Sequence, residues 1–505
     1  MTQETSTMTL NPNALAQTDN LFGYVEPQAA LGSDRLQVSS AEVKRAYTEL
    51  EQRYRERLVV DPRLTRQLVS FQANKERSNY RWYKYKEGFS AALVEHFLAQ
   101  AGITRGAIFD PFAGSGTTLF ASSALGMDAF GIELLPIGVS IIETRKRLKQ
   151  EAAPTDLQAL SNAAAKRPWR NIQRLARINE LNITQGAYSE ATHKEMAQYL
   201  AWAHEQPGLL KDVFIFALLC VLEQVSFTRK DGQYLRWDYR SGRRQGKTQF
   251  DKGRIEVFGD AIASKLAQIA SDIQADQPAD LFAPAGQQIQ GNITLQSGSC
   301  LDLMLNLGDQ SFDAVITSPP YCNRYDYTRT YALELALLGV DEKGLSQLRQ
   351  NMLSCTVENR SKDLIAINPA WAKAIAVADR QQALQATVEF LDGLKERSEL
   401  NNNGIPRMVR GYFYEMACVI QECARVLKDG ARMVMVNDNV RYAGASVPVD
   451  LILSDMAECL GLETENILVL PGGKGNSSQQ MGAHGRDALR KCVYVWRKKK
   501  KRAEK

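Results

Sequence analysis

The sequence predicts an α/β fold, in which helices cover both faces of a mixed sheet and a largely helical segment is inserted. The first observation is that two short apolar segments, 107–110 and 128–133, are each followed by a segment with helical spacing. The second is that this alternation resumes after a long interruption, with the segments 293–296, 314–317 and 432–437. Strands and helices that alternate in this order are typical of a mainly parallel sheet.

The length of the chain, 505 residues, predicts more than one structural unit. A single hydrophobic core usually stops growing near ~250–300 residues, so we expect about two to three units. In chain order, we expect a disordered N-terminal segment (1–40), N-terminal helices with the first half of the α/β domain (41–150), an inserted and mainly helical region (151–285), the α/β domain with a proline-rich turn (286–340), a second insertion (341–405), the end of the α/β domain (406–497) and a basic tail (498–505).

The elements themselves follow from local patterns. Apolar residues recur with helical spacing in 41–70 and again in 85–100, before a turn at Gly102. The same spacing predicts helices at 117–125, 135–148 and 412–428, and an apolar run predicts a final strand at 492–496.

Composition excludes several classes of protein. No stretch approaches the ~18 apolar residues that indicate a membrane span. The first twenty residues lack the basic start and apolar centre of a secretory signal, so we expect a cytoplasmic protein. Eight scattered cysteines without a CxxC pair, together with four histidines, do not suggest a metal site.

The first motif is the segment Asp110–Thr118, DPFAGSGTT, between a predicted strand and a predicted helix. Its two glycines let the backbone approach a ligand, and the first amides of the helix point toward it. Glu133 ends the next strand, where a carboxylate usually binds two ribose hydroxyls of a nucleoside cofactor. The loop is too short for a Walker phosphate loop and lacks its Gly-Lys-Ser/Thr. The alternative is a tight turn with a surface glutamate.

The second motif is the segment Phe312–Tyr321, an apolar strand that runs into Ser-Pro-Pro-Tyr. Two prolines stiffen the turn and leave its carbonyls as acceptors. The Ser318 hydroxyl and a proline carbonyl would suit an exocyclic amino group, and Tyr321 offers a flat face for a base removed from its stack. The alternative is an ordinary Pro-Pro turn with a packed tyrosine.

These two motifs together resemble those of the amino-methyltransferases, which use S-adenosylmethionine to methylate exocyclic nitrogens of DNA bases. The resemblance implies a Rossmann-like mixed sheet, and the segment 71–90 is similar to the family's N-terminal cofactor-side motif. The residues that it implies for cofactor binding are Asp110, Phe112, Ala113, Gly114, Ser115, Gly116, Thr117, Glu133 and Asp302. The residues that it implies for catalysis are Ser318, Pro319, Pro320 and Tyr321.

The residue before Pro-Pro-Tyr bears on the choice of base. Serine at this place is more typical of the family's cytosine-N4 members, whereas adenine-N6 members usually carry Asp or Asn. The implied mechanism is direct: the amino group donates to the Ser318 side chain and the Pro319 carbonyl, then attacks the methyl carbon. It requires no covalent intermediate on the enzyme and no metal.

The segment 226–254 carries nine Lys/Arg against three Asp, with aromatic residues interleaved. This composition is expected at a nucleic-acid surface, although a solvated basic loop whose aromatics pack on the core is the alternative. The candidate DNA-binding residues are Arg229, Lys230, Arg236, Trp237, Arg240, Arg243 and Arg244. The second insertion, 341–405, would be a further DNA contact or a lid.

The resemblance implies a site-specific DNA methyltransferase that acts on cytosine N4, in a restriction-modification or defence system. Its partners would be double-stranded DNA and a separate cognate endonuclease, because no nuclease-like carboxylate-lysine cluster stands out; no membrane or metal is expected. The alternatives are an adenine-N6 enzyme, an RNA base-amine methyltransferase, and a DNA-binding module that has lost catalysis.

Overall fold

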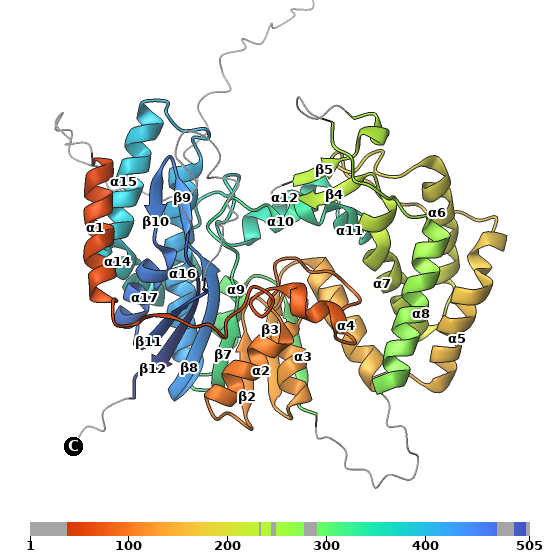
Figure 1. Ribbon diagram of the computed structural model, residues 1–505, viewed down its shortest axis with the longest axis horizontal. Coiled ribbons are helices and arrows are strands. Elements are labelled where there is room, and N and C mark those ends of the chain that lie inside the picture. The colour runs from red at the N-terminus through yellow and green to blue at the C-terminus, as the bar shows by residue number, and fades with distance from the viewer. Residues whose placement is uncertain (1–37, 232–233, 244–248, 277–289, 472–488, 501–505) are drawn as a thin grey trace, which may run out of the picture.

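The computed structural model describes residues 38–231, 234–243, 249–276, 290–471 and 489–500. Its centre is an eight-stranded sheet, seen in Figure 1. The strand order is β1 (Leu58–Val60), β11 (Leu462–Val469), β12 (Lys491–Lys498), β8 (Leu427–Asp438), β7 (Phe312–Thr317), β2 (Ala107–Asp110), β3 (Asp128–Glu133) and β6 (Ile293–Ser297). Only β12 runs antiparallel to its neighbours. The predicted mixed and mainly parallel sheet is therefore confirmed.

Alternate residues of the central strands face opposite helical layers. Phe109 of β2 and Val315 of β7 belong to the core cluster that includes α16 (Ile405–Val426) and α17 (Val449–Cys459). Ile108 and Ala314, their neighbours in the chain, belong to the cluster of α2 (Ala91–Gln100) on the other face. Strands buried on both faces need apolar side chains at nearly every position, which explains their continuous apolar sequence.

Further helices complete these layers and connect the strands. Within the sheet, the Phe109 ring of β2 stacks on the Phe312 ring of β7, with ring centres 4.9 Å apart. The other helices and strands around the sheet are α1 (Ser40–Arg53), α3 (Thr117–Ala124), α9 (Cys300–Leu303), β9 (Val440–Tyr442) and β10 (Ala445–Val447). Two helices that follow β7, α10 (Tyr327–Thr330) and α11 (Ala332–Leu337), pack instead on the core of the segment between β3 and β6.

The segment between β3 and β6 lies beside the sheet and has its own core (Figure 1). Helices make up most of its described part, and a small hairpin, which the sequence did not predict, lies between the last two of them in chain order. Its elements are α4 (Pro136–Glu151), α5 (Pro154–Lys166), α6 (Glu190–His204), α7 (Gly208–Val225), β4 (Thr228–Asp231), β5 (Tyr234–Trp237) and α8 (Phe258–Asp276).

The second insertion is largely part of the sheet's own helical layer. Its helices are α12 (Glu342–Asn351), α13 (Leu364–Ile367), α14 (Ala372–Arg380) and α15 (Gln382–Glu396). Trp371, Leu384 and Leu391 are fully buried in the same core as α16. Of the described residues in this insertion, the end of α12 and those directly after it line the cavity described below. The expectation of a lid or a further DNA contact stays a prediction.

Two expectations concern the ends of the chain. The N-terminal segment 1–40, apart from its last three residues, lies outside the described residues, as does the basic tail from 501 onward.

In the part of the chain that is described, no helix combines the length and the apolar character needed to cross a membrane. The described residues also contain no group of three or more His, Cys, Asp or Glu arranged to hold a metal ion.

Candidate active site

The glycine-rich loop connects the carboxyl end of β2 to the first residue of α3. Gly114 and Gly116 have φ angles of +56° and +79°, a region that disfavours side chains with a Cβ atom. The loop is held closely by α4, because a Cβ atom added at Gly138 would lie 2.6 Å from the carbonyl oxygen of Gly114. The loop conformation thus depends both on its own glycines and on the close packing of α4 against it.

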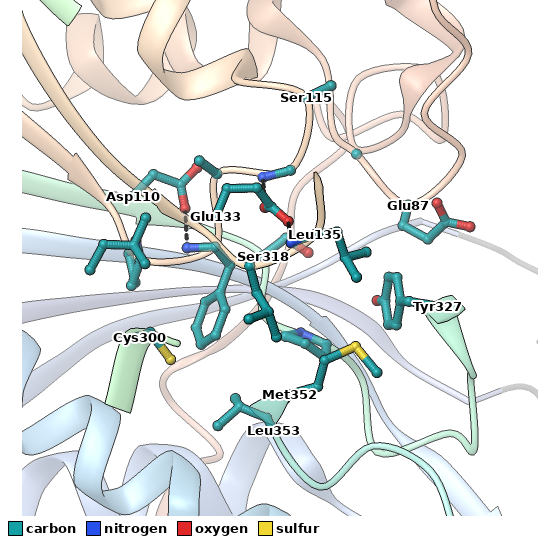
Figure 2. A pocket seen from close by; sticks show the side chains of 18 of the residues that line it. Glu87, Asp110, Ser115, Glu133, Leu135, Cys300, Ser318, Tyr327, Met352 and Leu353 are labelled. Carbon is teal, nitrogen blue, oxygen red and sulfur yellow. Dashed lines mark hydrogen bonds between the residues drawn. The ribbon is translucent and has the colours of Figure 1, made fainter. Parts of the chain in front are cut away.

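Glu133 ends β3 and turns its carboxylate toward this loop (Figure 2). The carboxylate accepts hydrogen bonds from the backbone amides of Gly114 and Leu135, both at 2.7 Å. Burial raises the pKa of Glu133 to about 7, although these amide bonds favour the charged form and act in the opposite direction. Glu133 thus holds the loop through the Gly114 amide and places a titratable carboxyl at the cavity wall.

Asp110 joins the two motifs that the sequence analysis singled out. Its carboxylate accepts a hydrogen bond from the Thr317 hydroxyl at 2.6 Å and another from the Phe112 amide at 3.0 Å. Thr317 is the last residue of β7, directly before Ser318. Burial raises the pKa of Asp110 to about 6, against the effect of these hydrogen bonds. Neighbouring parallel strands end at one sheet edge, so the cofactor loop and the proline turn meet there.

A cavity opens at this edge of the sheet. The empty space at this edge is about 780 Å³, a volume that includes the solvent at its open mouth. Among the residues expected to bind or react, those that line it are Asp110, Phe112, Ala113, Gly114, Ser115, Thr117, Glu133, Ser318 and Pro320. Gly116, Pro319 and Tyr321 do not line it, and they lie next to residues that do.

Ser318 is the polar group that the proline turn presents to this cavity (Figure 2). Its hydroxyl donates to the carbonyl oxygen of Val436 on β8 at 3.1 Å, and the Tyr321 hydroxyl lies 3.3 Å away. Burial raises the pKa of Tyr321, and the nearby Asp438 raises it further. Because the serine has a single proton to share between these two neighbours, at least one lone pair of its oxygen remains available to accept a hydrogen bond.

Comparison with known proteins identifies the family. A family model described as DNA methylase matches residues 16–143. The type II methyltransferase M.AvaI of Nostoc sp. is 52% identical over 460 residues, which are 90% of this chain and 94% of the relative. The type II methyltransferase M.BsoBI of Geobacillus stearothermophilus is 39% identical over 463 residues, 86% of this chain and 88% of the relative. The chain belongs to the type II DNA methyltransferases. The resemblance to the DNA amino-methyltransferases is therefore confirmed.

One expected cofactor residue of this methyltransferase lies elsewhere. Asp302 is exposed on α9 and does not line the cavity. Gly298, Ser299 and Cys300, at the start of the same turn, line it instead. The physical reason is that Asp302 is two residues beyond Cys300 on α9, about 200° around the helix axis, so it faces solvent. Ser299 and Cys300 thus form this part of the wall, and the cofactor role of Asp302 stays a prediction that its exposed position does not favour.

Two of the expected DNA-binding residues of the methyltransferase are in its interior. Lys230 pairs with Glu334 at 2.5 Å, and the two side chains are 3% and 1% exposed. Trp237 is buried in the helical core, with the Arg243 guanidinium 4.0 Å from its ring centre. Lys230 and Trp237 thus hold the hairpin in place and are not available as surface contacts, which corrects the expectation.

The other candidates are at or near the surface. Arg229 is exposed, Arg236 pairs with Asp231 at 3.3 Å, and Arg240 pairs with Asp238 at 2.6 Å. The Arg240 guanidinium and neighbouring amides lower the pKa of Asp238. Arg243 donates to the carbonyl oxygens of the loop before α6, and Arg244 lies outside the described residues.

Several cavity residues were not predicted from the sequence. Tyr327 and the run 351–353 line the side of the cavity near Ser318 (Figure 2). They come from segments with no recognisable motif, so no local signal could have found them. Tyr85 and Glu87 also line the cavity, and they fall within 71–90, the segment whose resemblance to a cofactor-side motif gave the only signal.

Proposed function

We propose that this type II methyltransferase transfers a methyl group from S-adenosylmethionine to an exocyclic base amine of double-stranded DNA, with cytosine N4 as the target. The observation that carries the proposal is the hydrogen bond between Asp110 and Thr317. It brings the glycine-rich loop and the Ser-Pro-Pro-Tyr turn to one cavity, where a cofactor and a base would have to meet. The enzyme would act in a restriction-modification or defence system, beside a separate cognate endonuclease.

The charge of the cavity fits this cofactor. Asp110 and Glu133 present two buried carboxyls to it, and among the described residues neither forms an ion pair with Lys, Arg or His. S-adenosylmethionine carries a sulfonium and an ammonium group, and its ribose has two hydroxyls that suit the Glu133 carboxylate. When bound, it supplies an electrophilic methyl group. The loop from Phe112 to Thr117 would hold its methionine half, with Ser299 and Cys300 on the opposite wall.

Ser318 is the proposed orienting group for the target amine. Its lone pairs would accept one N–H of the amine, and the Pro319 carbonyl would accept the other. Two such bonds pull the nitrogen out of conjugation with the ring, so that its lone pair can attack an electrophile. The target base must leave the helix to reach this position. Tyr321, half-buried beside Ser318, would support the base from the turn.

The hairpin β4–β5 is the proposed DNA contact. Arg229, Arg236, Arg240 and Arg243 are on it or directly after it, and Arg229 has no ion-pair partner among the described residues. Exposed arginines bind phosphates and base edges, whereas buried residues cannot. Lys230 and Trp237 would contribute indirectly, by fixing the hairpin to the helical core.

Mass spectrometry of nucleosides tests the reaction and the base together. Unmethylated DNA is incubated with the protein and S-adenosylmethionine, then digested to nucleosides. N4-methylcytosine is the expected product. N6-methyladenine would keep the mechanism and overturn the choice of base, whereas methylation of RNA alone would favour an RNA enzyme. Cofactor binding with neither DNA product would likewise favour the RNA enzyme, whereas a protein that does not bind S-adenosylmethionine would support a DNA-binding module that has lost catalysis.

Cofactor affinity should depend on pH through Glu133. Its pKa of about 7 means that the carboxylate is protonated as the pH falls below neutrality. A protonated carboxyl accepts the ribose hydroxyls less well, so we expect affinity for S-adenosylmethionine to be about tenfold lower at pH 6 than at pH 8. Isothermal titration calorimetry at each pH measures this change, and Glu133→Gln should flatten it.

Lowering the pH has opposite effects through Glu133 on cofactor affinity, which falls, and on the stability of the fold, which rises. Its pKa in the folded protein is above the ordinary value of 4.5, so the folded state binds the proton more tightly than the unfolded state. Its contribution to stability therefore increases as the pH falls through about 7. Protonation of Glu133 therefore stabilises the folded protein at pH 6, so weaker binding of S-adenosylmethionine at that pH would not be caused by unfolding. Equal affinity at pH 6 and pH 8 would contradict the proposed contact with the ribose.

A further inference from the structure

The cofactor loop rests on an arginine that lies outside the cavity. Arg145 is on α4, is only 5% exposed and does not line the cavity. Its guanidinium carbon lies 3.8 Å from the centre of the Phe120 ring and 4.7 Å from that of Tyr80. Burial lowers the pKa of Arg145 to about 10, and Tyr80 offsets part of this effect. At neutral pH the side chain therefore carries its charge in the interior.

Few groups compensate this buried charge. Nη1 of Arg145 donates to the carbonyl oxygen of Ser115 at 2.9 Å, whereas Nε and Nη2 have no hydrogen-bond partner among the described residues. No described carboxylate forms an ion pair with it, and its favourable neighbours are the two aromatic rings and the polar end of Tyr80. A buried charge without an opposite charge is costly. Because the Ser115 carbonyl accepts the hydrogen bond of this buried side chain, we look for the role of Arg145 at that carbonyl.

That carbonyl belongs to a peptide fixed at both ends. The amide of Gly116, on the same peptide as the Ser115 carbonyl, donates to the carbonyl of Ala113 at 2.7 Å. A Cβ atom added at Gly116 would lie 2.8 Å from Cγ1 of Ile142 on α4, so the turn is pressed against this helix. One end of the peptide is thus held by the turn itself and the other by Arg145, while Ser115 lines the cavity.

We propose that Arg145 is a positioning residue for the cofactor loop, an inference that rests on the proposed binding of S-adenosylmethionine in this cavity. By holding the Ser115 carbonyl, the guanidinium fixes the Ser115–Gly116 peptide and with it the backbone of Gly114 and Ser115 that the cofactor would meet. A loop already ordered before binding does not lose conformational freedom when the ligand arrives. Loss of this anchor should weaken cofactor binding and leave the chemical step at Ser318 nearly intact.

The experiment compares Arg145→Met with Arg145→Lys and with Arg147→Met. Arg147 is also on α4, but it pairs with Glu151 and Asp212 near the surface, so its variant is a matched control. Calorimetry gives the affinity for S-adenosylmethionine, and methyl transfer to unmethylated DNA gives KM and kcat. We expect Arg145→Met to raise Kd and KM for the cofactor at least tenfold, with kcat within threefold of the wild type. Arg145→Lys should recover part of the affinity, and Arg147→Met should match the wild type.

The two ways of failing are distinguishable. If the wild type does not bind the cofactor, the proposed function fails and this inference fails with it. If the wild type binds and Arg145→Met binds within twofold as well, only the inference is overturned. A merely structural role would lower the folded fraction and the turnover without raising KM. If Arg145→Met does not fold, Arg145→Lys decides: a KM raised at least threefold supports the proposal, and an unchanged KM overturns it.

Discussion

Ser318→Ala is expected to reduce turnover more than tenfold while cofactor affinity stays within twofold of the wild type. The serine oxygen is the polar group that the proline turn presents to the cavity, and its hydroxyl donates a hydrogen bond to the Val436 carbonyl. Its removal takes away an acceptor that the amine would need in the transition state, and a tenfold loss corresponds to about 1.4 kcal/mol of barrier. The cofactor loop does not depend on this hydroxyl. Single-turnover methyl transfer and calorimetry measure the two quantities separately.

Ser311→Ala is the matched control for this experiment. Ser311 comes directly before β7, at the opposite end of the strand from Ser318, and its hydroxyl donates to the carbonyl of Gly308 at 2.8 Å. Both variants remove one serine hydroxyl beside the same strand, and only one of these hydroxyls is at the cavity. An unchanged turnover in Ser318→Ala would remove the role proposed for this residue. A parallel loss of cofactor affinity would instead indicate that the hydroxyl maintains the cavity.

Lys230→Met is expected to cause the largest loss of stability, about 3–5 kcal/mol, because it leaves Glu334 buried without its partner. The Lys230 ammonium also lies 4.5 Å from the centre of the Tyr331 ring and donates to the Tyr83 hydroxyl at 3.1 Å. One methionine therefore removes contacts among three separate segments of the chain. Urea denaturation of the variant and the wild type side by side measures the difference.

Two further variants separate the buried charge from the hairpin itself. Arg229→Met changes the neighbouring residue of β4, which is exposed, so it should leave stability within about 0.5 kcal/mol and weaken binding to duplex DNA. Lys230→Met combined with Glu334→Leu should recover most of the lost stability, because no unpaired charge remains. A Lys230→Met protein within 1 kcal/mol of the wild type would show that the pair is not the main link between these segments.

The sheet was predicted best where its strands are buried on both faces. The segments 107–110 and 128–133 coincide with β2 and β3, because strands buried on both faces have mainly apolar interiors that stand out in the sequence. β11, with the sequence LETENILV, was not predicted. Its apolar residues are spread among polar ones, and its place in the sheet depends on pairing with β12 and β1, which no local pattern contains.

In the candidate site, too, the features that depend on neighbouring residues were predicted and those that depend on distant segments were not. The cofactor loop and the proline turn are short contiguous motifs, and the structure brings both to one cavity. Asp302 was assigned by analogy from its place in the chain, but it is on the side of α9 away from Cys300 and does not line the cavity. Lys230 and Trp237 looked like a nucleic-acid surface by composition, yet both are buried. Composition does not reveal that the partner of Lys230 is Glu334, more than a hundred residues further along.

By itself the sequence determined the class of the sheet, the two motifs and the family that they resemble. Glycines at positive φ, a carboxylate at a strand end and a doubled proline act through their nearest neighbours, so their consequences can be read locally. Only the tertiary structure decided which basic residues reach solvent, which segments complete the cavity, and that Arg145 donates to the Ser115 carbonyl of the glycine-rich loop. Burial and charge pairing depend on segments far apart in the chain, because the solvation of each side chain is set by what packs against it.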